Sequence, residues 1–304
     1  MRFKGLIVVF LFTLYSFYTH AQEDSTSFLK PSDSLNQKRL TTVMLGQGLF
    51  YTGSLFALNT FWYKDYDKSK FHTTNDFGQW LQVDKAGHVY STYQLSRLSS
   101  NLFSWSGIDK SKASLYGAFI GFSYVSTIEV LDGYSKEWGY SWSDMAANAL
   151  GTGLFLGQEF LWNEQRILLK YSYHSTDFAR QRPGTLGDGL QEEFLKDYNG
   201  QTYWLSFNIQ SFTKWDNFPK WLNFAIGYGG HGMLTGSYNS EESGLYPQDR
   251  YRQYYLSLDL DLSKIPTKSH FLRTVFDVLN LIKLPFTTVE FNDKKEVLVH
   301  PIYF

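Results

Sequence analysis

The 304-residue sequence contains no cysteine. This absence excludes disulfides, thiolate catalysis, zinc or iron–sulfur sites built on cysteine, and lipid attachment through a cysteine thiol. The sequence also has no excess of charge of one sign, because it contains 28 basic and 29 acidic residues. A near-neutral chain does not favour nucleic acid as the main partner. Any chemistry must therefore use histidine, carboxylates, hydroxyls and shape.

Motifs of nucleophilic, zinc-dependent or phosphate-binding enzymes are missing as well, since the sequence has no G-x-S-x-G, H-E-x-x-H or P-loop. Aromatic residues, by contrast, are abundant, with 22 tyrosines, 26 phenylalanines and 9 tryptophans. Such enrichment is typical of membrane interfaces and of half-buried sheets. An enzymatic function would have to depend on a single polar cluster, and the balance of the sequence favours a protein that is not an enzyme.

The amino terminus has the order of a secretory signal. Arg2 and Lys4 precede an apolar run from Leu6 to Tyr18, which small and polar residues follow. We predict a cleavable signal peptide at residues 1–21 rather than an uncleaved anchor, because the run is shorter than the roughly 20 residues of a membrane span. Residues 22–37 are polar and without a pattern, and we expect a flexible lead-in there. The mature protein is expected to be periplasmic or associated with the outer membrane.

The first half of the mature chain is predicted to be helical. Four apolar segments, separated by short charged loops, have helical length: Leu40–Tyr63, Ala86–Phe103, Ala113–Leu131 and Ser141–Trp162. The economical arrangement is an up-and-down four-helix bundle over residues 38–165. Two pairs of glycines one helical turn apart, Gly117 with Gly121 and Gly153 with Gly157, indicate close helix contacts.

In the second half, residues 166–304, the apolar residues recur at every second position, which is the period of a β-strand. Apolar and polar residues alternate over 203–210, 222–229 and 254–262, with weaker strands over 167–173, 287–291 and 297–303 and a short amphipathic helix over 271–284. The fold class is therefore α+β, a helical bundle followed by an antiparallel β-rich region. A transmembrane barrel wall and a sheet packed on the bundle both fit, and about six strands favour the sheet or an incomplete barrel-like wall.

Polar residues of catalytic type stand on three of the predicted helices. Each helix carries two of them three or four positions apart and so on one face: Asp84 with His88, Glu129 with Asp132, and Asp144 with Asn148. A divalent metal could be bound by His88, Glu129 and Asp132, or the group could transfer protons. Two other interpretations remain open. The residues could form a polar network that holds the helices together, or serve as helix caps, as in the Ser141-x-x-Asp144 capping box.

The segments DKAGH (84–88), EVLDG (129–133) and SWSDMAANALG (141–151) resemble the YfiM-like family of predicted periplasmic or outer-membrane lipoproteins, a domain of unknown function numbered 2279. The resemblance covers about residues 40–160 and maps the family's polar positions onto Lys85 and the six residues above. A fainter similarity to VanZ-like membrane proteins follows the same order of motifs and is an analogy only. This chain has no cysteine to carry a lipid, so an anchor would have to come from its own apolar surface.

These observations lead to three hypotheses. The first is an exported cell-envelope protein with a structural, assembly or lipid-interacting role, whose partners are membrane lipid or envelope proteins. No cofactor is expected, with a divalent metal at the polar residues as the alternative. The alternative is a metal-assisted hydrolase of a phosphorylated or acylated envelope component, in which Lys85 or Arg97 would neutralise a phosphate. A third hypothesis is a transporter or channel-like element, with polar residues that line a path between the helices. The oligomeric state is left open.

Overall fold

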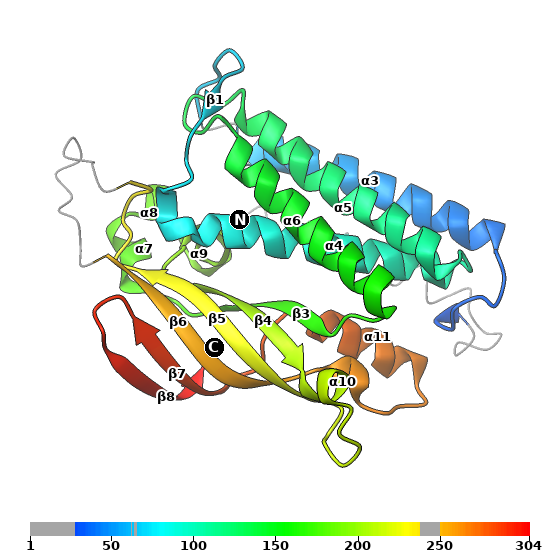
Figure 1. Ribbon diagram of the computed structural model, residues 1–304. Coiled ribbons are helices and arrows are strands. Elements are labelled where there is room, and N and C mark those ends of the chain that lie inside the picture. Colours follow the sequence, from blue (N-terminus) through cyan, green and yellow to red (C-terminus); the bar gives the residue numbers. More distant parts are fainter. Residues whose placement is uncertain (1–27, 62, 64–65, 238–249) are drawn as a thin grey trace.

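The computed structural model describes residues 28–61, 63, 66–237 and 250–304, so the predicted signal sequence and residues 22–27 of the lead-in lie outside the described residues. Long helices come first and an antiparallel sheet follows (Figure 1), which confirms a mixed helix-and-sheet protein with an antiparallel C-terminal region. Each of the four apolar segments forms a helix: α3 (Gln37–Phe61), α4 (Val83–Trp105), α5 (Lys110–Asp132) and α6 (Trp142–Trp162).

Helix α4 is central to the helical layer and packs against both α5 and α6, which also contact one another. Helix α3 makes few contacts with α4 and lies along the far side of α5 (Figure 1). Its side chains at Met44, Leu49 and Phe56 are 61%, 72% and 71% exposed. The four-helix bundle is therefore not confirmed. Helices α4, α5 and α6 share a core, and α3 packs on them through one face only, with Val43 buried against Phe103 and Ala113.

Two backbones approach closely where α5 crosses α4. A Cβ atom built on Gly117 would lie 2.5 Å from the Ser96 carbonyl oxygen, and one on Gly121 would lie 2.6 Å from the Ser96 nitrogen. The second pair behaves differently, because a Cβ on Gly153 or Gly157 would meet nothing within 4 Å. Only the first glycine pair is thus used for helix packing.

The sheet has six antiparallel strands in sequence order. They are β3 (Ile167–Tyr173), β4 (Gln201–Asn208), β5 (Leu222–His231), β6 (Tyr251–Leu260), β7 (Phe286–Asn292) and β8 (Val297–Tyr303). Short helices join them: α7 (Asp177–Gln181), α8 (Pro183–Leu186), α9 (Leu190–Lys196), α10 (Ile209–Thr213) and α11 (His270–Leu279). A separate parallel pair, β1 (Thr73–Thr74) with β2 (Tyr140–Ser141), ties the loop before α4 to the start of α6.

The sheet has inverted polarity: its buried face is polar and its other face is apolar. Five side chains of the buried face are fully excluded from water, namely Lys170, Ser206, Asn223, Asp259 and Thr288. The sheet curls over this face (Figure 1), so that the Tyr303 hydroxyl of β8 lies 2.9 Å from Thr202 Oγ1 of β4. The Lys170 ammonium is 2.8 Å from the Asp259 carboxylate and donates to the Leu260 carbonyl at 2.6 Å. Hydrogen bonds and one ion pair thus compensate for burying polar groups there.

The helices and the sheet meet where α4 crosses β3 and β4. The Tyr90 ring of α4 lies 5.9 Å from the Tyr171 ring and 5.7 Å from the Tyr203 ring, centroid to centroid. Arg97 of α4 forms an ion pair with Asp277 of α11. These contacts cover one end of the apolar face and leave the rest of it exposed.

Candidate functional site

The polar residues predicted from sequence come together at one end of the helical layer. The first turns of α4 contribute Asp84, Lys85 and His88, the last turns of α5 contribute Glu129 and Asp132, and the start of α6 contributes Asp144 and Asn148. Because α5 runs opposite to its neighbours, its carboxyl end meets the amino ends of α4 and α6. The six candidates and Lys85 therefore form one group, which we call the polar cluster together with Asp76 from the preceding loop.

Lys85 is the electrostatic centre of the polar cluster. Its ammonium lies 2.7 Å from Asp76, 2.9 Å from Asp84 and 2.8 Å from Asp144, measured to the nearest carboxylate oxygen. All four side chains are at most 14% exposed. Burial lowers the pKa of Lys85, but the three carboxylates outweigh it and hold that pKa above its usual value. The lysine is thus permanently charged and bridges the loop, α4 and α6.

The three carboxylates around Lys85 are not equivalent. Burial raises the pKa of Asp76, but hydrogen bonds from Lys85, Ser141 and Ser143 outweigh it and bring the pKa to about 2. Burial raises the pKa of Asp84 to about 6 against the attraction of Lys85. Burial also raises the pKa of Asp144. Asp76 is therefore the most acidic of the three carboxyl groups.

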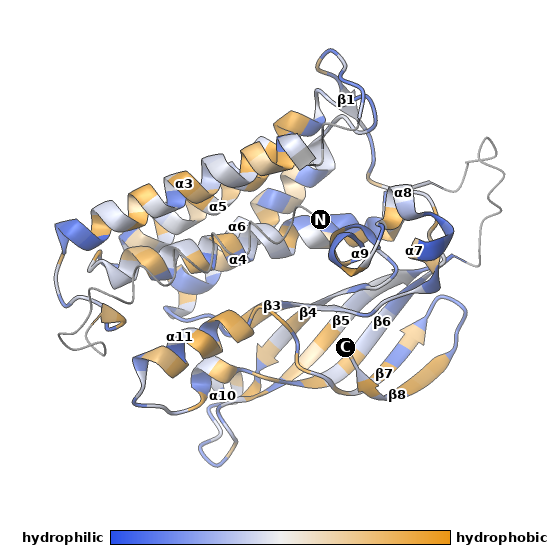
Figure 2. Cartoon of the chain, turned by 180° about the vertical axis from the view of Figure 1, so that it is seen from behind, coloured by the Kyte–Doolittle hydropathy of each residue, from blue (hydrophilic) through white to orange (hydrophobic). Residues whose placement is uncertain are grey.

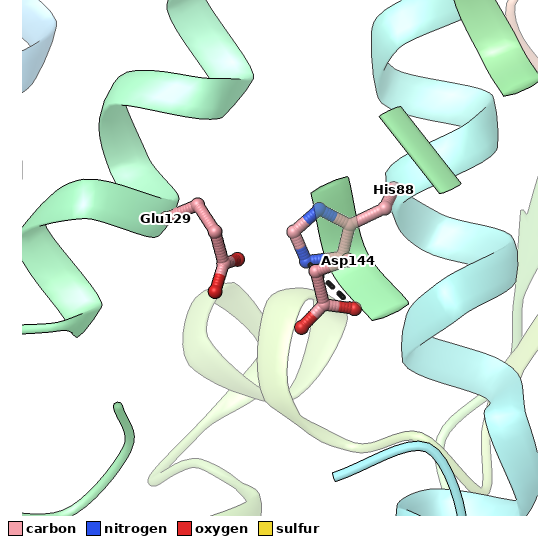
Figure 3. A group of neighbouring side chains, drawn as sticks. All are labelled: His88, Glu129 and Asp144. Carbon is pink, nitrogen blue, oxygen red and sulfur yellow. Dashed lines mark ion pairs between the residues drawn. The ribbon is translucent and has the colours of Figure 1, made fainter. Parts of the chain in front are cut away.

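On the other side of Asp144 lies a second grouping (Figure 3). One potential ligand atom from each of His88, Glu129 and Asp144 lies within 4.8 Å of the other two. His88 Nε2 is 3.8 Å from Asp144 Oδ1, and His88 Nδ1 is 3.0 Å from the side-chain oxygen of Asn148. The Ser141 amide donates to Glu129 Oε1 at 2.5 Å. We call His88, Glu129 and Asp144 the triad.

The carboxyl group of Glu129 has a strongly raised pKa. Glu129 is 1% exposed, and burial raises its pKa to about 8, with further contributions from the charges of Asp144, Asp132 and Asp76. Burial and the neighbouring carboxylates thus favour the protonated form of this carboxyl group. The polar cluster contains more carboxyl groups than cationic side chains, and such a site can hold protons or a cation.

Asp132 was predicted from the sequence to bind a metal together with His88 and Glu129, but it lies outside the triad. The Tyr63 hydroxyl donates to Asp132 Oδ1 at 2.5 Å, and burial raises the pKa of Asp132 to about 6. Among the described residues, the histidine-containing group close enough to hold an ion includes Asp144 and not Asp132. Another group, Asp76, Asp84 and Asp144, surrounds Lys85, whose ammonium already supplies the positive charge.

Sequence reasoning missed Asp76 and Tyr63 as members of this site. Asp76 lies in the connection between α3 and α4, where no periodic pattern exists, and Tyr63 was predicted as the last residue of an apolar helix, whereas α3 ends at Phe61. Asp76 reaches the polar cluster because Thr73 and Thr74 pair with Tyr140 and Ser141. This long-range pairing has no local signal in the sequence.

An unusual turn orients the start of α4. Trp80, Leu81 and Gln82 have φ values of 49°, 50° and 63°, a left-handed conformation that costs roughly 1–2 kcal/mol for each such residue. The turn is held from outside, since the Trp80 amide donates to the Gly236 carbonyl at 2.8 Å and the Tyr228 hydroxyl donates to the Leu81 carbonyl. The β-rich half thereby fixes the point at which α4 begins.

By length and composition alone, α5 is the one helix among the described residues that could cross a membrane. A core helix of a soluble protein would pass the same test.

The comparisons with known proteins concern the segment that carries the polar cluster. No curated protein and no solved structure matched the chain. Residues 72–157 match the family model described as predicted periplasmic lipoprotein, DUF2279, and this range includes every residue of the polar cluster. The description agrees with an exported protein of the periplasm or the outer membrane. Residues 72–157 are thus similar to the predicted periplasmic lipoproteins (DUF2279), the family that the sequence motifs resemble.

Proposed function

We propose that this exported protein has a structural, lipid-interacting role in the cell envelope, and that the apolar face of its sheet contacts a lipid bilayer. The observation that carries the proposal is the inverted polarity of the sheet. Strands that face lipid alternate apolar residues outward with polar residues inward, the reverse of a sheet that covers an apolar core.

The outer face is apolar over several adjacent strands. Its side chains at Leu205, Phe224, Ile226, Leu258 and Val299 are between 37% and 65% exposed. The register pairs Leu205 with Ile226 and Phe224 with Leu258, so these side chains form a continuous patch. A soluble monomer rarely exposes a large continuous apolar patch without a partner.

Aromatic and basic residues at the rim of this face favour lipid over a protein partner. Helix α11 buries no residue, and Phe271 on it is 64% exposed (Figure 2 shows the apolar colouring of this helix). Trp215 and Trp221 precede β5 and are 58% and 39% exposed. Tryptophan is enriched at membrane–water interfaces, and basic side chains near it attract anionic headgroups. Exposed basic residues flank both segments: Lys214, Lys220, Lys268 and Arg273.

Vesicle flotation of the signal-cleaved chain tests the proposal. We expect co-flotation with vesicles that contain anionic lipid, and loss of it when Phe224, Ile226 and Leu258 are replaced together by serine. A matched triple variant at Leu45, Leu49 and Phe119, which are exposed on α3 and α5, should float as the wild type does. If the wild type stays unbound, or if only the helix variant loses binding, the sheet is not the lipid-binding surface.

A second candidate, a metal-assisted hydrolase of a phosphorylated or acylated envelope component, is favoured by the triad, whose histidine and carboxylates are of metal-ligand type. The cations expected to bind a phosphate are already engaged, however. Lys85 is held by three carboxylates and Arg97 is paired with Asp277. Hydrolysis of p-nitrophenyl phosphate or p-nitrophenyl acetate with added Zn²⁺ or Mn²⁺, abolished by Glu129→Gln, would support this candidate over the lipid-binding role.

A further inference from the structure

We propose that His88, Glu129 and Asp144 form a binding site for one divalent transition-metal ion. This inference does not depend on lipid binding, since the triad lies in the helical layer and the proposed lipid surface is on the sheet.

The spacing of the three ligand atoms suits a single ion. Two ligands of a tetrahedral ion, each about 2.1 Å from it, lie about 3.4 Å apart. His88 Nε2 and Asp144 Oδ1 are 3.8 Å apart, and no two of the three ligand atoms are separated by more than 4.8 Å. Small side-chain rotations would therefore bring all three onto one ion.

The contacts of His88 prepare its second ring nitrogen for this role. Asn148 is fully buried, and its side-chain oxygen lies 3.0 Å from His88 Nδ1 and 3.1 Å from the Thr92 hydroxyl. When Nδ1 carries the proton and donates it to Asn148, Nε2 directs its lone pair toward Asp144. Metal-binding histidines use their other nitrogen in this way, and such a hydrogen bond fixes both tautomer and ring orientation.

The charges around the triad also favour a cation. Asp144 Oδ1 lies 2.8 Å from the Lys85 ammonium and 3.8 Å from His88 Nε2. Glu129 is 1% exposed, accepts a hydrogen bond from the Ser141 amide, and has no ion pair with a cationic side chain among the described residues. Buried carboxyl groups are ordinarily paired or bound to a metal, so a cation beside Glu129 would complete the site.

The donor set identifies the class of ion. One imidazole with two carboxylates suits Zn²⁺ or Mn²⁺, whereas Mg²⁺ and Ca²⁺ prefer oxygen ligands alone. The excess of carboxyl groups in the polar cluster would compensate for the charge of the ion, and the His88 side chain, which is 21% exposed, leaves a path to solvent. Lys85 can release Asp144, because it also contacts Asp76 and Asp84.

Metal analysis of the signal-cleaved chain tests the site. After metal removal and dialysis against Zn²⁺ or Mn²⁺, we expect about one ion for each chain and a higher midpoint of thermal unfolding with metal than with chelator. Titration calorimetry should show at least tenfold weaker binding for His88→Ala, Glu129→Gln and Asn148→Ala. Glu129→Gln is the most informative variant, because the amide has the size and shape of the carboxyl group and should preserve the fold while removing a ligand oxygen that can carry charge.

Two variants serve as controls. His72→Ala removes an imidazole that contacts Ser69, and Asp67→Asn changes an exposed carboxylate that pairs with Lys136, and neither group belongs to the polar cluster. Both variants should bind the ion as the wild type does. The site would be refuted if the wild type retained no stoichiometric ion, or if folded Glu129→Gln bound it with unchanged affinity.

Discussion

Lys85 is the residue on which the polar cluster depends for stability. Replacing it by methionine would leave three nearly buried carboxylates without their common cation, and losing one member of a buried ion pair typically costs 3–5 kcal/mol. We expect Lys85→Met to lower the free energy of unfolding by about that amount in urea denaturation. Lys136→Met is the matched control, because its pair with Asp67 is exposed at both ends and should contribute under about 1 kcal/mol. Equal losses in the two variants would contradict this assignment.

Lys283 gives the sheet interior a specific pH dependence. Burial lowers its pKa from 10.5 to about 8, against the attraction of Asp259. Between these two values the unfolded chain binds more protons than the folded one, so stability rises with pH. Relative to Lys283→Met, the wild type should gain about 2 kcal/mol in the free energy of unfolding between about pH 8 and pH 10. Lys268→Met, at an exposed position, should show no such change, and a pH-independent difference for Lys283→Met would show that Lys283 has an ordinary pKa.

At the level of single residues, the sequence was informative wherever helical spacing placed polar groups in an apolar segment. The spacing of Asp84 with His88, and of Asp144 with Asn148, placed these side chains on the correct helices. Asp76 could not be found, because it enters the polar cluster through the pairing of β1 with β2. The choice between Asp132 and Asp144 as neighbour of His88 depended on how α5 and α6 pack, which helical periodicity does not specify.

Among the elements, the contact between α4 and α5 is the most sensitive to side-chain size. A methyl group at Gly121 would collide with the backbone of Ser96, whereas one at Gly157 would meet open space. We expect Gly121→Ala to destabilise the protein by about 1–3 kcal/mol and Gly157→Ala to stabilise it by about 0.5–1 kcal/mol, since alanine favours the helix. Thermal unfolding of both variants measures this. A stabilising Gly121→Ala would show that the two helices are not in close contact there.

The elements also show where a pattern predicts structure and where it does not. Long apolar helices and alternating strands were recognisable because their periods extend over many residues. Helices α7 to α10 have four to seven residues each, too few for a period, and none of them was predicted from the sequence. The position of α3 outside the core was not predictable either, because its apolar residues surround the helix rather than marking one face.

For the whole molecule, we propose that the outer face of the sheet contacts lipid. The alternation of apolar and polar residues predicted which residues share a face, but which face is buried depends on the curl of the sheet and on the packing of α4. Polar groups such as Lys170 and Asp259 are enclosed, and the apolar residues opposite them are left outside. This arrangement agrees with an exported protein of the periplasm or outer membrane and explains how a chain without cysteine could attach to a membrane.

The most direct test uses the absence of cysteine, which allows single labelled cysteines without background. An environment-sensitive fluorophore at position 226, 258 or 299 should shift to the blue and brighten when anionic vesicles are added. The same label at Lys136 or Glu192, exposed positions away from the sheet, should not respond. Response at the three sheet positions alone would establish the lipid-facing surface. No response at them, with the labelled proteins folded, would contradict the account.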